Sequence, residues 1–204
     1  MKDNYIRLTE NCKLAISQAL HKTIQANPDK ISPNDIHKSC FYYANLGADL
    51  CTKIVCSVNS VNDYKKLYYT ACGGGFSLRI AKEVTNTTKG MNFGAGNPNF
   101  DDGNYHLWIV GVVKDEKLTE PCEFIDFTSR YYCKNTSDQG HKWERSDISD
   151  YLWLDETQMV SYGISLNPNH DIAKKSHDAW IDSDCRHKML DQALEIYKKL
   201  RVPE

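Results

Sequence analysis

The chain has 204 residues and a mass of 23.4 kDa, enough for one domain with a sizeable core and too little for two ordinary domains. Hydrophobic residues make up 41% and charged residues 25%, which excludes wholesale disorder. A net charge of −2 and a pI near 6.4 disfavour general nucleic-acid binding. The longest apolar run, residues 107–113, has seven residues and is far too short to span a membrane. We therefore predict a single domain over residues 1–204, with neither nucleic acid nor membrane as a partner.

The N-terminal segment and the cysteines indicate a compartment. Residues 1–13 lack the apolar core and cleavage signature of a classical signal peptide, so we predict a cytoplasmic protein, with a signal-less export route left open. None of the eight cysteines pairs in C-x-x-C spacing, which leaves zinc ribbons and thioredoxin-like motifs unsupported. In a reducing cytosol most of these thiols stay free. Free cysteines are usually small apolar core residues, and the question is whether one is a nucleophile.

Two helices are predicted at the start of the chain. Residues 5–25 carry apolar side chains at helical spacing, and Asn27-Pro28 ends the pattern. A polar linker follows over residues 29–39. The next helix, beginning at Ser39 or just before it, is apolar on more than one side and is therefore predicted to be buried. Cys40 would then lie in its first turn.

Strands follow in the middle of the chain. Residues 68–72 form a short apolar segment that we expect Gly73-Gly74-Gly75 to break. Residues 76–84 alternate apolar and polar side chains, which is typical of a half-buried strand. The next stretch, residues 85–104, is rich in Gly and Asn and has no periodicity. Loops of this length inside one domain are often lids or binding loops.

The remaining elements define the fold class. Residues 105–113 and 122–128 are strongly apolar and separated by a short polar connection, so we expect an antiparallel hairpin. After a weakly patterned polar region, residues 183–201 predict a closing helix. Two helices, then antiparallel strands, then a helix indicate an α+β architecture.

Three residues along these elements have the types and order that thiol catalysis needs. Cys40 opens a buried helix, His106 begins a strong strand, and Asp126 lies on the next strand. An ordinary thiol, with a pKa of about 8.5, is mostly protonated at neutral pH, whereas a helix N-terminus and a neighbouring imidazolium both stabilise thiolate. The histidine then serves as general acid and base, and the aspartate fixes its tautomer and orientation.

The context of Asp126 favours its pairing with His106. A carboxylate inside the apolar string FIDF is costly to bury without a partner. Direct pairing of the two residues across the hairpin centres the turn on residues 115–117, the polar tip, and facing side chains then lie about 5 Å apart at Cβ. A register shift of two residues would leave them diagonal neighbours.

This arrangement resembles the papain-like superfamily of cysteine enzymes, and within it the transglutaminase-like branch. There a Cys begins the core helix, and a His and an Asp follow on adjacent strands. The local strings fit, with His106-Leu107-Trp108 and Ile125-Asp126-Phe127-Thr128, and the resemblance covers residues 34–132. The chain is similar to poorly characterised bacterial members of the superfamily. The resemblance implies a papain-like fold, with a helical N-terminal part whose nucleophile helix packs on an antiparallel sheet, and it implies no metal or organic cofactor.

The chain departs from the papain pattern near the nucleophile. Papain-type peptidases carry a glutamine ahead of the cysteine, whose amide helps to form the oxyanion hole. This chain has Asn34 six residues before Cys40 instead, and Phe41-Tyr42 stand where a tryptophan follows the cysteine. We predict that Asn34 and the backbone N–H of Cys40 stabilise the oxyanion. If Asn34 points elsewhere, loops at Gly73–Gly75 or Gly94–Gly96 are the alternatives.

Other candidate sites are weaker. The spacing of His170, His177, Cys185 and His187 matches no standard metal site. The glycine runs match neither the P-loop nor the Rossmann form, so phosphate binding is not predicted. Cys51 is a rival nucleophile, but it lies in mid-helix rather than at a positive terminus. We expect Cys12, Cys51, Cys56, Cys122 and Cys133 to be structural thiols.

The sequence therefore predicts a cysteine peptidase or amidase that acts on an amide or acyl carbonyl, with Cys40, His106 and Asp126 as a triad. Its partner would be a peptide, protein or small amide substrate. One alternative is an acyltransferase, transglutaminase or deamidase that uses the same triad. Others are a non-catalytic binding or regulatory protein on the same fold, and an unrelated α+β domain in which Cys40 is only a core residue. The oligomeric state stays open.

Overall fold

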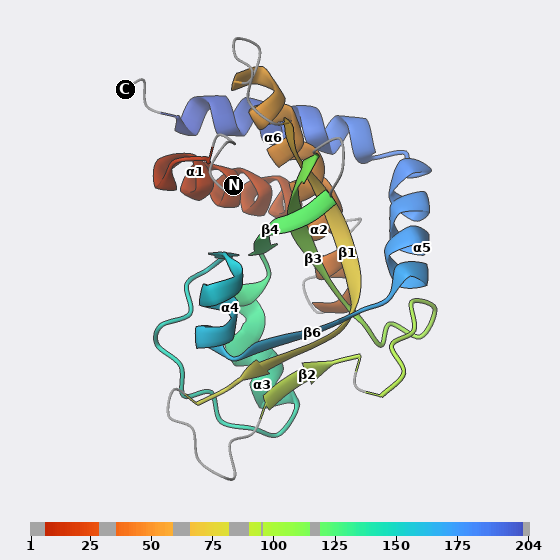
Figure 1. Cartoon of the computed structure of the whole chain (residues 1–204). Helices are drawn as coiled ribbons and strands as arrows, with labels where there is room; N and C mark the ends of the chain where they lie inside the picture. The colour runs from red at the N-terminus through yellow and green to blue at the C-terminus, as the bar shows by residue number, and fades with distance from the viewer. Residues whose placement is uncertain are drawn as a thin grey trace.

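The computed structural model describes residues 7–28, 36–58, 66–81, 90–94, 96–114 and 119–201 (Figure 1). The helices are α1 (Glu10–Gln25), α2 (Ile36–Val58), α3 (Tyr132–Asp138), α4 (Glu156–Tyr162), α5 (His170–Ile181) and α6 (Arg186–Leu200), with a 3-10 turn η2 (Ser129–Tyr131) before α3. The strands are β1 (Lys66–Arg79), β2 (Gly90–Phe93), β3 (His106–Lys114), β4 (Thr119–Asp126), β5 (Leu152–Leu154) and β6 (Ile164–Pro168). The α+β class is confirmed.

The two N-terminal helices form as predicted, with one difference in where they begin. The hydroxyl of Thr9 caps α1 by accepting from the backbone N–H of Cys12, and the helix ends at Gln25. Helix α2 begins at Ile36, three residues earlier than Ser39. Cys40 is therefore the fifth residue of α2 and lies in its second turn, not its first.

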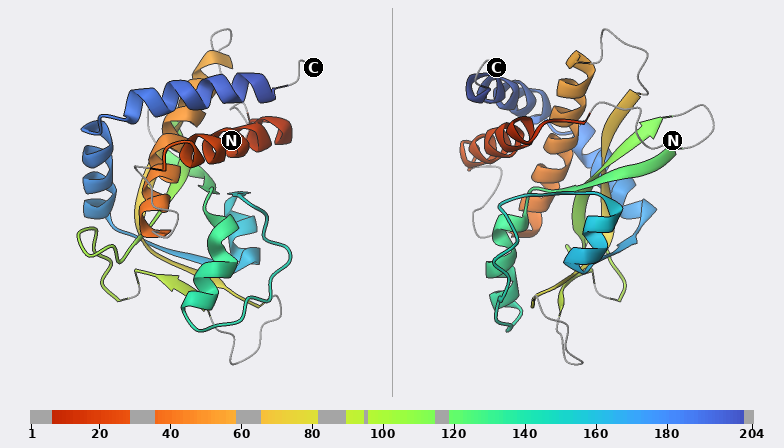
Figure 2. Two further views of the ribbon diagram at one scale, coloured as in Figure 1. Left: turned by 180° about the vertical axis from the view of Figure 1, so that it is seen from behind. Right: turned by 60° about the vertical axis from the view of Figure 1, so that its left-hand side comes forward.

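The strands form one antiparallel sheet in the order β2-β1-β3-β4-β5, with β6 also paired to β1. Helix α2 packs against β1 and β3, and α1 and α6 pack against each other and against α2. Helices α1, α2 and α6 lie on one side of the sheet (Figure 2, right). Strands β2 and β6 and helices α3 and α4 gather at the end of the molecule away from α1 and α6 (Figure 1).

Strand β1 runs through the three glycines that were expected to break it. Gly74 is in register with His106 of β3 on one side and with Pro168 of β6 on the other. A Cβ on Gly74 would lie 2.2 Å from the carbonyl oxygen of Asn167, far inside van der Waals contact. The glycines therefore let neighbouring segments approach β1 closely, rather than ending the strand.

Substitution of Gly74 tests this close approach. Gly74→Ala is expected to lower the free energy of unfolding by about 2–3 kcal/mol, because the new methyl group overlaps backbone rather than a flexible side chain. Urea denaturation measures the loss. Gly140→Ala is the control, since Gly140 has a φ of +75° but nothing within 4 Å of its Cβ position, and it should cost only about 1 kcal/mol. Equal losses in the two variants would contradict this role of Gly74.

The long segment expected as one loop contains a strand. Within residues 85–104, β2 pairs with β1, with Phe93 in register with Phe76. The outer edge of β2 is covered by the Gln139 side chain, which accepts from the N–H of Asn92 at 3.2 Å and donates to its carbonyl at 2.8 Å. Four residues are too short for apolar periodicity to show. Residues 82–89 and residue 95 lie outside the described parts of the chain.

The β3–β4 hairpin is confirmed, but its register differs from the direct pairing. Ile109 pairs with Ile125, and continuing that register sets Asp126 opposite Trp108. His106 and Asp126 are therefore diagonal neighbours on one face of the sheet. The register shifts between Gly111 and Val112, where Cys122 is the extra residue of a β-bulge on β4.

The last third of the chain holds a helix that the sequence did not reveal. Helix α5 buries only Ile172, Ser176 and Trp180, so its apolar stripe is narrow and is interrupted by a serine. Asn169 caps α5 by accepting from the backbone N–H groups of Asp171 and Ile172. The predicted closing helix is confirmed as α6, which begins at Arg186.

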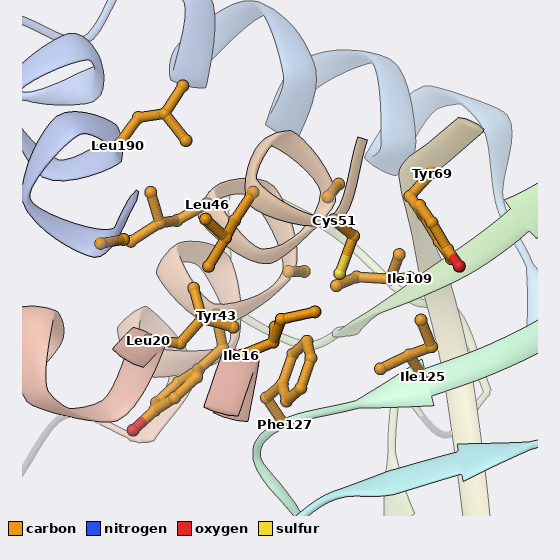
Figure 3. Packing of buried hydrophobic residues seen from close by; sticks show 14 of the residues in the cluster. Ile16, Leu20, Tyr43, Leu46, Cys51, Tyr69, Ile109, Ile125, Phe127 and Leu190 are labelled. Atoms are coloured by element: carbon orange, nitrogen blue, oxygen red, sulfur yellow. The ribbon is translucent and has the colours of Figure 1, made fainter. Parts of the chain in front are cut away.

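Two hydrophobic cores lie on opposite faces of the sheet. The first joins the helices to the sheet and includes Leu107, Ile109, Ile125 and Phe127; its packing around α2 is drawn in Figure 3. The second contains Trp108, Phe124, Tyr132 and residues of β1, β2 and β6. Successive residues of β3 thus face different cores, as strand geometry requires. No described helix is long and apolar enough to cross a membrane.

Candidate active site

His106 and Asp126 form a buried pair. His106 Nε2 lies 2.6 Å from Asp126 Oδ2, and the two residues are only 3% and 2% exposed. A carboxylate only accepts hydrogen bonds, so Nε2 carries a proton and donates it. The two residues are diagonal neighbours rather than directly paired as predicted, and they are still close enough for a charge-assisted hydrogen bond.

The Asp126 carboxylate accepts four hydrogen bonds, two on each oxygen. Oδ1 accepts from the backbone N–H of Thr128 at 2.7 Å and from its hydroxyl at 2.6 Å. Oδ2 accepts from His106 and from the hydroxyl of Tyr132. A carboxylate has about four acceptor positions, so Asp126 is saturated and fixed in orientation.

Cys40 completes the group from α2. Its thiol makes a side-chain hydrogen bond with the His106 imidazole. Because Nε2 is bound to Asp126, the ring nitrogen left for the thiol is Nδ1. The structure thus brings Cys40, His106 and Asp126 together in the predicted order, although His106 and Asp126 come from the sheet and Cys40 comes from the helical side.

Aromatic rings surround the imidazole. The ring centroids of Phe76 and Phe93 lie 4.7 and 5.2 Å from that of His106, with Phe93 stacked on it. Trp108 and Tyr132 follow at 6.4 and 6.5 Å. These rings restrict water around the His106–Asp126 hydrogen bond, which strengthens the interaction between the two charges.

The environment sets the charge of both residues. Burial alone lowers the pKa of His106, but the Asp126 carboxylate and the Cys40 thiol outweigh burial and raise the pKa to about 10. Burial alone raises the pKa of Asp126, but the His106 imidazolium and the hydrogen bonds from Thr128 and Tyr132 hold the pKa below its ordinary value of 3.8. The geometry therefore favours imidazolium next to carboxylate at neutral pH.

Other cysteines differ from Cys40 in their surroundings. Cys51 is fully buried on α2 among core residues (Figure 3), and burial together with the Glu123 carboxylate raises its pKa well above 9. Burial also raises the pKa of Cys72, to about 11. Cys56 and Cys133 are exposed. Cys51, the rival nucleophile, is held in its protonated form.

The structure describes only one of the two predicted oxyanion donors, the backbone N–H of Cys40. Asn34 lies outside the described residues. In a helix that begins at Ile36, the N–H of Cys40 belongs to the helical hydrogen bonds and points to the carbonyl four residues earlier. The alternative at Gly73–Gly75 is wrong as a loop, because these residues belong to β1.

The weak metal candidates do not converge. Over the described parts of the chain, no group of three or more His, Cys, Asp or Glu side chains is placed to hold a metal ion. His170 and His177 are exposed on α5, His187 is exposed on α6, and Cys185 lies 3.0 Å from the hydroxyl of Ser183.

The sequence missed the residues that support the pair. Thr128 follows Asp126 by two positions, a spacing that often returns a hydroxyl and an N–H to the aspartate, and this was the one available signal. Tyr132 follows the 3-10 turn η2, and across that turn its hydroxyl reaches Asp126. Phe93 stood in a segment without periodicity. Turns and short strands of this kind depend on tertiary contacts.

Comparisons with known proteins add the fold and nothing on chemistry. Neither a scan of protein-family models nor a search of curated proteins finds a match to this chain. Among solved structures, the crystal structure of a genomics target is similar over 97% of this chain and 82% of its own, with a TM-score of 0.55 and 12% sequence identity. That likeness shows a shared fold.

Proposed function

We propose that this protein is a cysteine peptidase or amidase that cleaves an amide or related acyl carbonyl through Cys40, His106 and Asp126. The observation that carries the proposal is the continuous hydrogen-bonded series from the Cys40 thiol through the His106 imidazole to the Asp126 carboxylate. Its order along the chain and its elements resemble those of papain-like and transglutaminase-like enzymes, and we propose membership of that superfamily on this basis.

In the proposed acylation step, the Cys40 thiolate attacks the carbonyl carbon of the substrate. The carbon–sulfur bond forms, and the carbonyl electron pair moves to the oxygen of a tetrahedral intermediate. When the electron pair returns, the carbon–nitrogen bond breaks and the His106 imidazolium gives its Nδ1 proton to the leaving amine. Asp126 keeps the ring oriented and stabilises imidazolium before the transfer.

Water resolves the resulting thioester. Neutral His106 takes a proton from the attacking water, the carboxylic acid is released, and the Cys40 thiolate and the imidazolium are restored. The balance of atoms is the hydrolysis of one amide bond to an acid and an amine. It requires no oxidant, reductant or metal ion.

Release of an amine tests the proposal. A library of short peptides and N-acyl amides with chromogenic leaving amines is incubated with the native protein and with Cys40→Ala. We expect release by the native protein for part of the library and a loss of roughly 1,000-fold or more in the variant, because the nucleophile is gone. Rapid acid quenching and peptide mapping should place the acyl group on Cys40.

The matched control is Cys51→Ala, which removes a thiol from the same helix. It should retain the native rate, because Cys51 is fully buried and protonated. Release that survives Cys40→Ala, or a folded native protein that releases nothing and forms no adduct across the library, would count against an enzyme and favour a non-catalytic binding protein.

A further inference from the structure

We propose that Tyr132 is a positioning residue that shares one carboxylate oxygen of Asp126 with His106 and thereby lowers the degree to which that carboxylate stabilises the imidazolium. The inference rests on the proposed function, since a general acid must be able to give its proton away. It assigns the phenol a part in the reaction that is exerted through Asp126, the residue to which its hydroxyl donates.

The position of Tyr132 leaves its hydroxyl one role. Tyr132 begins α3, directly after the turn that follows β4, and its side chain is fully buried. Its ring lies 5.7 Å from that of Phe76 and 6.3 Å from that of Trp143, so apolar contacts hold the ring. Its hydroxyl donates to Asp126 Oδ2. The apolar contacts of the ring and this hydrogen bond together fix the phenol as a donor to that oxygen.

The donors divide between the two carboxylate oxygens in a way that matters for His106. Both donors from Thr128 are on Oδ1, whereas Tyr132 and His106 are both on Oδ2. A donor withdraws negative charge most strongly from the oxygen it contacts. The phenol of Tyr132 therefore competes with His106 for the negative charge on the same oxygen. The hydroxyl of Thr128 contacts the other oxygen, so its effect on His106 is weaker.

Burial makes this competition effective. The second core encloses Tyr132, so bulk water cannot replace a donor that is removed. Burial, and then the adjacent carboxylate, raises the pKa of Tyr132 well above its ordinary value of 10. The phenol thus stays protonated and donates wherever the protein is folded.

The chemical consequence concerns proton transfer. A buried carboxylate with its full charge on Oδ2 would stabilise the imidazolium so strongly that His106 would be a poor donor of its Nδ1 proton to a leaving amine. Two donors on one oxygen lower that charge and bring His106 closer to the acidity that general-acid catalysis at neutral pH needs. Tyr132 acts on the reaction through Asp126 and His106.

The test compares two conservative variants of the full chain, each of which removes one hydroxyl donor from Asp126. The pKa of His106 is measured by ¹⁵N-histidine NMR in the native protein, in Tyr132→Phe and in Thr128→Val. We expect Tyr132→Phe to raise the pKa of His106 by about one unit and Thr128→Val to raise it by less than half as much. If amide turnover is found, the alkaline limb of its pH profile should move up with the same ranking.

A second modification guards against a misfolded variant. Replacing Tyr132 site-specifically by 3,5-difluorotyrosine keeps the ring and makes the phenol a stronger donor, so the pKa of His106 should fall. Equal shifts in Tyr132→Phe and Thr128→Val, or a difluorotyrosine shift of the same sign as Tyr132→Phe, would overturn the inference. The proposed function fails in a different measurement, because a chain without Cys40 reactivity would still show these NMR shifts.

Discussion

In the His106→Ala variant, iodoacetamide should alkylate Cys40 at pH 6 at least about tenfold more slowly than in the native protein. An unperturbed thiol is well under 1% ionised at that pH, with a pKa of about 8.5, whereas a cysteine paired with an imidazolium is present largely as thiolate. The gain in thiolate is partly offset by the lower intrinsic nucleophilicity of a stabilised thiolate, which is why we expect about tenfold rather than several hundredfold. Mass spectrometry of the peptides gives a rate for each of the eight cysteines in one experiment.

In the native protein we expect Cys40 to react faster than the other cysteines, whereas solvent exposure alone predicts the opposite order. Cys40 is only 4% exposed, whereas Cys56 and Cys133 are exposed. If access alone set the rates, Cys56 and Cys133 would react first. Cys51 is the control for a buried thiol on the same helix and should stay unlabelled. Slow labelling of Cys40 with no dependence on His106 would contradict the nucleophile assignment and favour a structural cysteine.

Asp126→Asn should destabilise the protein by about 3–5 kcal/mol near pH 6, because it leaves a buried imidazole without its carboxylate. The amide also presents N–H groups where Thr128 and Tyr132 already donate. Urea denaturation of the native protein and the variant measures the difference. Asp138→Asn is the control, because Asp138 pairs with Lys134 at an exposed position, and it should cost well under about 1 kcal/mol.

The pH dependence of that difference has a defined sign. The pKa of His106 is raised from 6.5 to about 10 on folding, so its contribution to stability is full below pH 6.5 and is lost as the pH rises toward 10. The pKa of Asp126 is lowered from 3.8, so its contribution is present above pH 3.8 and is lost as the pH falls through the lowered value. The free energy of unfolding of the native protein should therefore exceed that of Asp126→Asn by the largest amount between about pH 4 and 6.5. A difference that grows between pH 7 and 10 would contradict an ion pair.

The grouping of Cys40, His106 and Asp126 could be predicted from sequence because its signals are local. A cysteine near the start of a buried helix, a histidine at the start of a strong strand and an aspartate inside an apolar strand each stand out in their own segment. The hairpin then limits how far apart His106 and Asp126 can lie. This is the part of the site that strand periodicity and chain order decide.

The rest depends on tertiary contacts that no single segment carries. Strand β1 continues through Gly73–Gly75 because two strands pack against it, whereas the local pattern of three glycines favours a break. Helix α5 is held by a narrow stripe and by contacts to other elements, including the hydrogen bond from Asn45 to Ser176. Tyr132 is six residues from Asp126 in sequence and meets it only after a turn.

Because of the bulge at Cys122, the number of residues in β4 determines the geometry of the candidate active site. On the far side of the bulge, Val113 pairs with Glu120 and Lys114 with Thr119. Carried on unchanged, that register would set His106 opposite Phe127, and Asp126 would point to the other face of the sheet, toward the helices. The additional residue Cys122, four positions before Asp126, places Asp126 on the same face of the sheet as His106. Whether β4 has this one additional residue, rather than which side chain the bulge carries, thus decides whether Asp126 and His106 lie on the same face of the sheet.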